Sequence, residues 1–148
     1  LRAAVTPYMG GGYMHATDDR TPVTFITRYY LDKIKRLCDA HGTKLLFVTA
    51  PSPVNHTMQR HNEVQALADA LAVPYLDLNL NTEELGIDWN LDTLDGGDHL
   101  NYTGCQKATA YLQRYMQTHY TLPDRRDDVR YEAWNKQAEE FEKLLPQP

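Results

Sequence analysis

Lys44–Ala50 (KLLFVTA), followed by the Pro-Ser-Pro of residues 51–53, is the stretch that decides the fold. It is a short, almost continuously apolar run that stops at two prolines. Such a run is typical of a strand that is buried on both faces, and strands of that kind belong to parallel sheets. We therefore expect a buried strand over residues 44–50, with its carboxyl end at the prolines.

Helices are expected before and after this strand. Thr21 as N-cap and Pro22 at the first helical position predict a helix in front of it. A second helix around residues 64–71 leads to Val73–Leu78 (VPYLDL), which is predicted to be a second strand. Because a strand–helix–strand crossover is nearly always parallel, we expect the two strands to be parallel and adjacent or nearly so.

Two more helices are predicted toward the C-terminus. After a polar, aperiodic loop over residues 79–100, Thr103 and Gln106 stand at capping-box spacing and predict a helix. The charged tail from about Asp127 is predicted to be an amphipathic helix packed on the body. Its apolar stripe consists of Trp134, Ala138, Phe141 and Leu145.

This order of elements indicates the α/β class, in a flavodoxin-like, three-layer α/β/α arrangement with a parallel sheet. A strand that is buried on both faces needs neighbouring strands on each side, and this chain has only two predicted strands. We therefore expect the chain to be only the C-terminal half of such a domain. Its first half is expected upstream of Leu1. On this interpretation residues 1–21 are a loop left from the upstream half, residues 22–120 the C-terminal half, and residues 121–148 a helical tail.

Charge and length exclude several classes of protein. The 148 residues leave room for one domain, and 15 Lys and Arg against 20 Asp and Glu give a formal net charge of −5. Nucleic-acid binders need a basic patch, so none is expected as a partner. His56 and His61 are five apart, which is off the spacing that puts two ligands on one helical face. We therefore predict no metal site and no cofactor.

The loop before the helix at Thr103 carries the candidate chemistry, in the run Asp95-Gly-Gly-Asp98-His99-Leu-Asn101. Ligands of open α/β sheets bind beyond the carboxyl ends of the strands, where this loop falls. An aspartate that accepts the Nδ1–H of His99 would leave Nε2 free as a general base. The adjacent glycines let Asp95 reach the ring, and Asp98 remains the alternative.

Three further residues are candidates for the substrate site. Ser52 is the only serine in the chain and follows the predicted strand, so it is either the nucleophile or a residue lining the cleft. Flanking prolines remove backbone N–H groups that an oxyanion hole would use. Asn101 could bind substrate or cap the following helix. Trp89 could shape a pocket or pack in the interior.

The Asp95–Asn101 run, followed by Tyr-Thr-Gly and Lys107, resembles the last block of the SGNH/GDSL hydrolase superfamily. More narrowly it is similar to membrane-anchored, cell-envelope SGNH proteins of Gram-positive bacteria, relatives of the D-alanine transfer protein of teichoic acid synthesis. Residues 49–53 (TAPSP), 86–90 (GIDWN) and 122–126 (LPDRR) fit the same subgroup. Gly96 stands where the superfamily usually has its aspartate, and the serine of its Gly-Asp-Ser-like turn has no counterpart here.

This resemblance implies a serine esterase or O-acyl transferase that acts on cell-envelope glycan or polymer esters. His99 and Asp95 or Asp98 would be its acid–base pair, and the missing half of the domain would supply the nucleophile. An acyl-ester or glycan would be the substrate, at the extracellular face of the cell envelope. A membrane would be contacted only through an N-terminal anchor outside this chain. The alternative is a non-catalytic SGNH-like scaffold or interaction domain.

Overall fold

Two short parallel strands lie at the centre of the fold. The structure, a computed structural model, describes residues 4–144. In it β1 (Phe47–Thr49) pairs in parallel with β2 (Tyr75–Asp77), with Phe47 opposite Tyr75 and Thr49 opposite Asp77. The prediction of two adjacent parallel strands is confirmed, although each strand covers only part of the predicted run.

The crossover between the strands is α2 (Met58–Leu71). The Thr57 side chain caps its N-terminus by accepting a hydrogen bond from a backbone N–H of the first turn. Leu67 and Ala68 are buried. The helix ends at Leu71, and its C-cap Ala72 takes a left-handed conformation with a φ of 50° and turns the chain back toward β2.

The first helix, α1 (Phe25–Ala40), begins three residues later than the sequence predicts. Thr24 is its N-cap, so the prediction that Thr21 caps it and Pro22 begins it is wrong. The reason is that Thr24 offers the same capping hydroxyl. The backbone N–H of Thr21 instead donates to the carbonyl of Gln59 at 3.1 Å, which holds this residue outside the helix.

The apolar face of α1 and part of β1 are exposed. Phe25, Tyr30 and Leu37 are 80%, 58% and 61% exposed, and within residues 4–144 no residue of α1 is buried. Val48 of β1 is 41% exposed. The prediction of a strand buried on both faces is therefore wrong for the described chain, because β1 has β2 as its one strand neighbour there.

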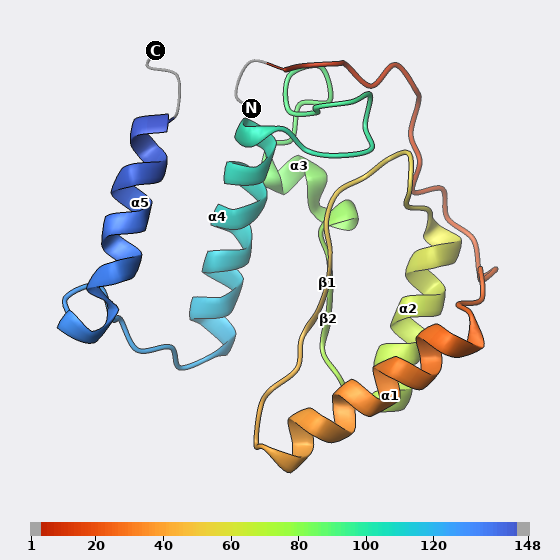
Figure 1. The fold of residues 1–148 in the computed structure, drawn as a ribbon. Helices are drawn as coiled ribbons and strands as arrows, with labels where there is room; N and C mark the ends of the chain where they lie inside the picture. Colours follow the sequence, from red (N-terminus) through yellow and green to blue (C-terminus); the bar gives the residue numbers. More distant parts are fainter. Residues whose placement is uncertain (1–3, 145–148) are drawn as a thin grey trace.

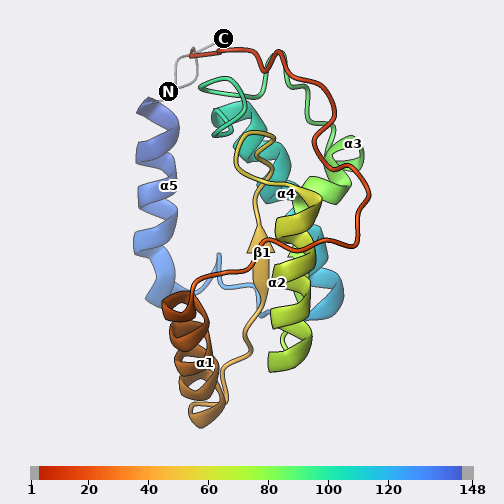
Figure 2. The ribbon, with the colours of Figure 1, turned by 90° about the vertical axis from the view of Figure 1, so that its right-hand side faces the viewer.

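Helices lie on both sides of the two strands. Figures 1 and 2 show α1 and α2 on one side and α4 (Tyr102–His119) on the other. Arg28 of α1 pairs with the buried Glu63 of α2 at 2.7 Å. The apolar core lies between β2 and α4. Its buried members are Leu76, Leu78, Leu85 and Ala108. The described part of the chain is therefore an α/β structure with a parallel sheet.

The connection from β2 to α4 is more structured than predicted. It contains a 3-10 helix, η1 (Leu78–Asn81), and one helical turn, α3 (Thr82–Leu85), where an aperiodic loop is predicted. Asn101 is the N-cap of α4, which begins at Tyr102, so the predicted N-cap Thr103 is two residues too late. The burial of Leu78 and Leu85 explains these turns, since both side chains pack in the core.

The C-terminal segment contains η2 (Val129–Tyr131) and the expected helix, α5 (Glu132–Leu144). The Phe141 ring lies 6.1 Å from the Tyr102 ring of α4, while Trp134 is 71% exposed. The predicted stripe residue Leu145 lies outside the described residues. Within them, no helix combines the length and the apolar character that crossing a membrane requires.

The segment that precedes α1 in the sequence lies beside the loop that precedes α4. Residues 4–24 contain no helix or strand, and Figure 1 shows them crossing the top of the molecule and then descending beside α2 to the start of α1. The Tyr8 N–H donates to the Trp89 carbonyl at 3.0 Å, and the Gly96 N–H donates to the Thr6 carbonyl at 2.8 Å. These bonds place the segment beside the candidate site.

Candidate functional site

The loop that carries His99 is a tight hairpin. Thr93 and Leu100 form an antiparallel bridge, and the Thr93 hydroxyl accepts a hydrogen bond from the Gly97 N–H at 2.7 Å. Gly96 and Gly97 have φ values of 75° and 98°, a region that other residues rarely adopt. The two glycines thus make the tight return that the sequence predicts.

His99 and Asp95 form a hydrogen-bonded pair on this hairpin. The ring Nδ1 of His99 lies 2.7 Å from the Asp95 Oδ2, and its backbone N–H donates to the Asp95 Oδ1 at 2.7 Å. Asp98 is farther away, with its Oδ2 3.7 Å from Nδ1. Of the two aspartates left open by the sequence, Asp95 therefore makes the hydrogen bond.

Electrostatics follow from this geometry. The hydrogen bond to Asp95, together with the charge of Asp98, raises the pKa of His99 above its ordinary value. The same hydrogen bond lowers the pKa of Asp95. The His99 side chain is 67% exposed, so the ring is open to a substrate.

Ser52 fastens the loop after β1 to the His99 hairpin. Its hydroxyl donates to the Asp98 carbonyl at 2.8 Å, and its backbone N–H donates to the Asn79 Oδ1 at 2.8 Å. The loop that holds Ser52 and the hairpin that holds His99 therefore lie side by side. The described hydrogen bonds of the Ser52 hydroxyl are to the loop backbone, with none to the His99 ring.

Asn101 is a buried helix cap. Its Oδ1 accepts from the Gly104 N–H at 3.1 Å, and its Nδ2 donates to the Leu91 carbonyl at 2.6 Å. The residue is 3% exposed. Of the two interpretations of Asn101 from the sequence, the described contacts match the cap.

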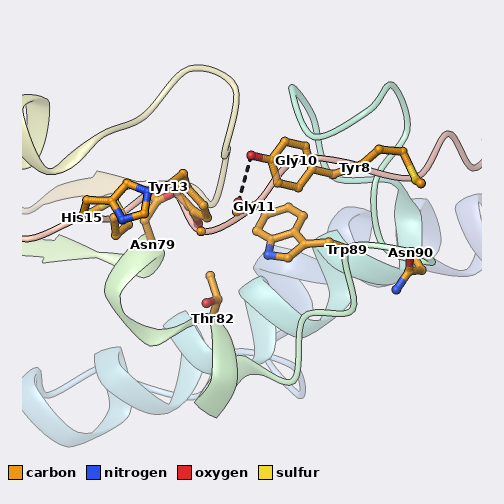
Figure 3. Close-up of a pocket in the computed structure, with 12 residues that line it drawn as sticks. Tyr8, Gly10, Gly11, Tyr13, His15, Asn79, Thr82, Trp89 and Asn90 are labelled. Carbon is orange, nitrogen blue, oxygen red and sulfur yellow. Dashed lines mark hydrogen bonds between the residues drawn. The ribbon is translucent and has the colours of Figure 1, made fainter.

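Trp89 lies on the wall of an open pocket of about 730 Å³. Figure 3 shows its ring beside the segment that holds Tyr8 and Tyr13, whose rings meet it edge-on at 6.2 and 6.0 Å. Asn79 and Asn90 also line the pocket. Asn79 also accepts a hydrogen bond from the Ser52 N–H. The pocket therefore adjoins the loop after β1, which contacts the hairpin through Ser52.

Sequence reasoning missed the two tyrosines of this pocket. They flank the Gly10–Gly12 run, in a segment that shows no hydrophobic periodicity typical of a helix or a strand. The only available signal was the pair of aromatic residues around three glycines. Nothing in that spacing predicts that the segment folds over Trp89.

Sequence reasoning also missed a buried carboxylate, Asp92, which joins the base of the hairpin to α4. Asp92 is 1% exposed and pairs with Lys107 of α4 at 2.5 Å. Its other oxygen accepts from the Thr103 hydroxyl at 2.9 Å. Burial raises the pKa of Asp92, but hydrogen bonds from Lys107, Thr103 and the Asp88 backbone outweigh it, and the net pKa is lowered.

Acid should weaken this support. Because the folded-state pKa of Asp92 lies below the ordinary value of about 3.9, its contribution is fully present above that pH and is lost as the pH falls through the folded pKa. We expect Asp92→Asn to have a lower free energy of unfolding than the parent near neutral pH. This difference in free energy should become smaller below about pH 4. Urea unfolding of both proteins across that range measures it. If the difference in the free energy of unfolding does not change with pH, the Asp92 charge does not stabilise the fold.

Comparison of this chain with protein-family models, with curated proteins and with solved structures finds no match.

Proposed function

We propose that this chain supplies the acid–base part of an SGNH-type esterase or O-acyl transferase that acts on esters of a cell-envelope glycan or polymer. The observation that carries the proposal is the hydrogen bond of 2.7 Å between the His99 Nδ1 and the Asp95 Oδ2. It lies on an exposed hairpin held against the loop that follows β1. A histidine oriented in this way is the general base that serine ester chemistry requires.

The chemistry would proceed through the free nitrogen of His99. Asp95 holds the Nδ1 proton, so the Nε2 lone pair can take the proton of a serine hydroxyl as its oxygen attacks the ester carbonyl. His99 then returns this proton to the departing alcohol. In the second step, water or an acceptor hydroxyl attacks the acyl-serine, His99 takes its proton and returns it to the departing serine oxygen, and the result is hydrolysis or transfer, respectively.

The proposal takes the nucleophile from a serine that this chain does not contain. The Ser52 hydroxyl already donates to the Asp98 carbonyl at 2.8 Å. Pro51 and Pro53, on either side, lack backbone N–H groups for an oxyanion hole. Ser52 therefore serves in this proposal as a residue that positions the hairpin.

The finer architecture is part of the same proposal. We infer a flavodoxin-like, three-layer domain in which further strands, from sequence outside this chain, pair with the open edge of β1. The exposure of Val48 and of the apolar residues of α1 supports this, since a helix and a strand with such faces normally bury them. The segment at residues 4–21 would join the further strands to α1, and the tail from residue 121 would lie outside the three layers.

The pocket at Trp89 supports a glycan or glycan-like polymer as the substrate. Three aromatic rings, of Tyr8, Tyr13 and Trp89, present flat apolar surfaces, and Asn79 and Asn90 add amide donors and acceptors. Sugar rings have apolar faces and hydroxyl edges, which such a mixture of groups can bind. A location at the extracellular face of the envelope, with an anchor outside this chain, rests on the family resemblance alone.

The second candidate is a non-catalytic scaffold of the same fold. It is favoured by one observation, the engagement of the only serine in a structural hydrogen bond. A domain without a nucleophile could still bind a glycan in the pocket at Trp89.

Ester hydrolysis by two forms of the protein distinguishes these candidates. The 148-residue chain is expected to show little turnover of a generic acetyl ester, and Ser52→Ala should leave that rate unchanged. The protein expressed from its whole gene should hydrolyse the ester and react with a fluorophosphonate serine probe. Robust hydrolysis by the short chain that Ser52→Ala abolishes would make Ser52 the nucleophile. No labelling of the whole gene product would favour the scaffold.

A further inference from the structure

Two histidines and an aspartate outside the Asp95–His99 pair converge beside the crossover helix. His56 follows β1, His61 lies in the first turn of α2, and Asp77 is the last residue of β2. The His56 Nε2 and the His61 Nδ1 each lie 2.8 Å from the same oxygen, Asp77 Oδ2. The side chains of His56, His61 and Asp77 are 8%, 15% and 1% exposed.

This convergence is crowded for a purely hydrogen-bonded carboxylate. The hydroxyl of Tyr75 also donates to Asp77 Oδ2, at 3.1 Å, so three donors meet one oxygen that has two lone pairs. A cation at the point where the two ring nitrogens and the oxygen meet would relieve this crowding, because both imidazoles would then act as acceptors. The three ligand atoms lie within 4.8 Å of one another.

The chemistry of the donor set indicates the kind of ion. Two imidazoles and one carboxylate bind divalent first-row transition metals and are a common ligand set of zinc sites that keep a fourth position for water. Calcium and magnesium prefer sites made of oxygen ligands alone. The buried position also keeps bulk water from competing with the ligands.

The surroundings of the cluster hold its ligands in place. The Asp77 Oδ1 accepts from the backbone N–H and the Nδ2 of Asn79, at 2.9 and 2.8 Å, which fixes the carboxylate. The His61 ring stacks on the Tyr75 ring, with centroids 5.5 Å apart. His56 lines a surface hollow of about 380 Å³, which gives an ion a route of entry.

The spacing argument against a metal site does not apply here. It assumes that His56 and His61 lie on one helix, where a separation of five places them on different faces. In the structure His56 precedes the N-cap Thr57, and only His61 is helical. The chain bends at the cap, and both rings turn toward Asp77.

We propose that His56, His61 and Asp77 bind one divalent transition metal ion, with Zn²⁺ as its representative and water as the fourth ligand. The ion joins the loop after β1, the start of α2 and the end of β2. It is independent of the ester chemistry, and its binding to the folded chain raises the melting temperature.

Titration of the intact chain with Zn²⁺, and with Co²⁺ as a coloured substitute, tests this proposal. One ion per chain should bind, with the visible absorption of tetrahedral Co²⁺, and Zn²⁺ should raise the Tm. His56→Gln and His61→Gln should each weaken Zn²⁺ binding by about 100-fold or more, since each removes a direct ligand and losing an outer-shell partner alone costs up to that much. His41→Gln, at an exposed histidine, is the matched control and should bind like the parent.

Ring-nitrogen NMR of the parent protein gives a readout that needs no variant. Zn²⁺ should move the nitrogen signals of His56 and His61 and leave those of His99 in place. The proposal is overturned if Zn²⁺ does not bind, if both glutamine variants bind it like the parent, or if His99→Ala removes the binding. The last result would place the ion at the exposed Asp95, Asp98 and His99 group instead.

Discussion

For the esterase proposed above, His99→Ala in the protein expressed from its whole gene is expected to lower kcat for ester hydrolysis by about 10²- to 10⁴-fold, the usual contribution of a positioned general base. The effect should fall on kcat with little change in stability, because the His99 side chain is 67% exposed. Steady-state kinetics with an acetyl ester, with urea unfolding alongside, measure both quantities. Retention of full activity would remove His99 from the mechanism.

The two neighbouring aspartates provide a matched pair of variants. Asp95→Asn should lower activity more than Asp98→Asn, because Asp95 lies 2.7 Å from the His99 Nδ1 and Asp98 lies 3.7 Å from it. Asp95→Asn should also shift the acidic limb of the kcat/KM profile to lower pH. The reason is that Asp95 raises the pKa of His99. With a neutral asparagine in its place, the ring loses its proton at a lower pH. Equal effects of the two variants would show that neither aspartate alone orients the ring.

A second large effect is expected at Gly104, in the first turn of α4. A Cβ there would lie 2.4 Å from the backbone carbonyl oxygen of Asp92 and 3.1 Å from its Cβ. Gly104→Ala should therefore destabilise the protein by about 1–3 kcal/mol, the usual cost of overpacking, even though alanine favours an isolated helix. Chemical unfolding of the parent and variant measures this difference.

Ala110→Gly is the control for Gly104→Ala. Ala110 lies exposed on the same helix, and its replacement should cost about 1 kcal/mol through helix propensity alone. The two positions should thus respond oppositely to the same methyl group. A stabilising Gly104→Ala would show that the hairpin can move away from α4 without loss.

The parts of the fold that the sequence predicts are those governed by local patterns. The apolar run at residues 44–50 marks β1, and a second strand after a helix makes the pair parallel, because the handedness of crossovers leaves few alternatives. The hairpin is predicted as well, since two glycines between Asp95 and His99 permit a return that most residues would resist.

The parts that the sequence does not predict depend on contacts between distant residues. Whether β1 is buried depends on its strand neighbours, which no pattern within β1 specifies. His56 and Asp77 are 21 residues apart, and their contact follows from where α2 begins. Thr21 and Thr24 both offer a capping hydroxyl, and the choice between them depends on a hydrogen bond to Gln59.

The setting of the two tryptophans gives the protein a built-in optical reporter. The chain contains only Trp89 and Trp134. Trp134 is 71% exposed and is open to collisional quenchers such as iodide. Trp89 is partly shielded, between two tyrosines that can pass excitation energy to it, and it lines the pocket. With Trp134 quenched, the remaining emission comes mainly from the pocket wall, so any ligand that binds there should change a signal that needs no label.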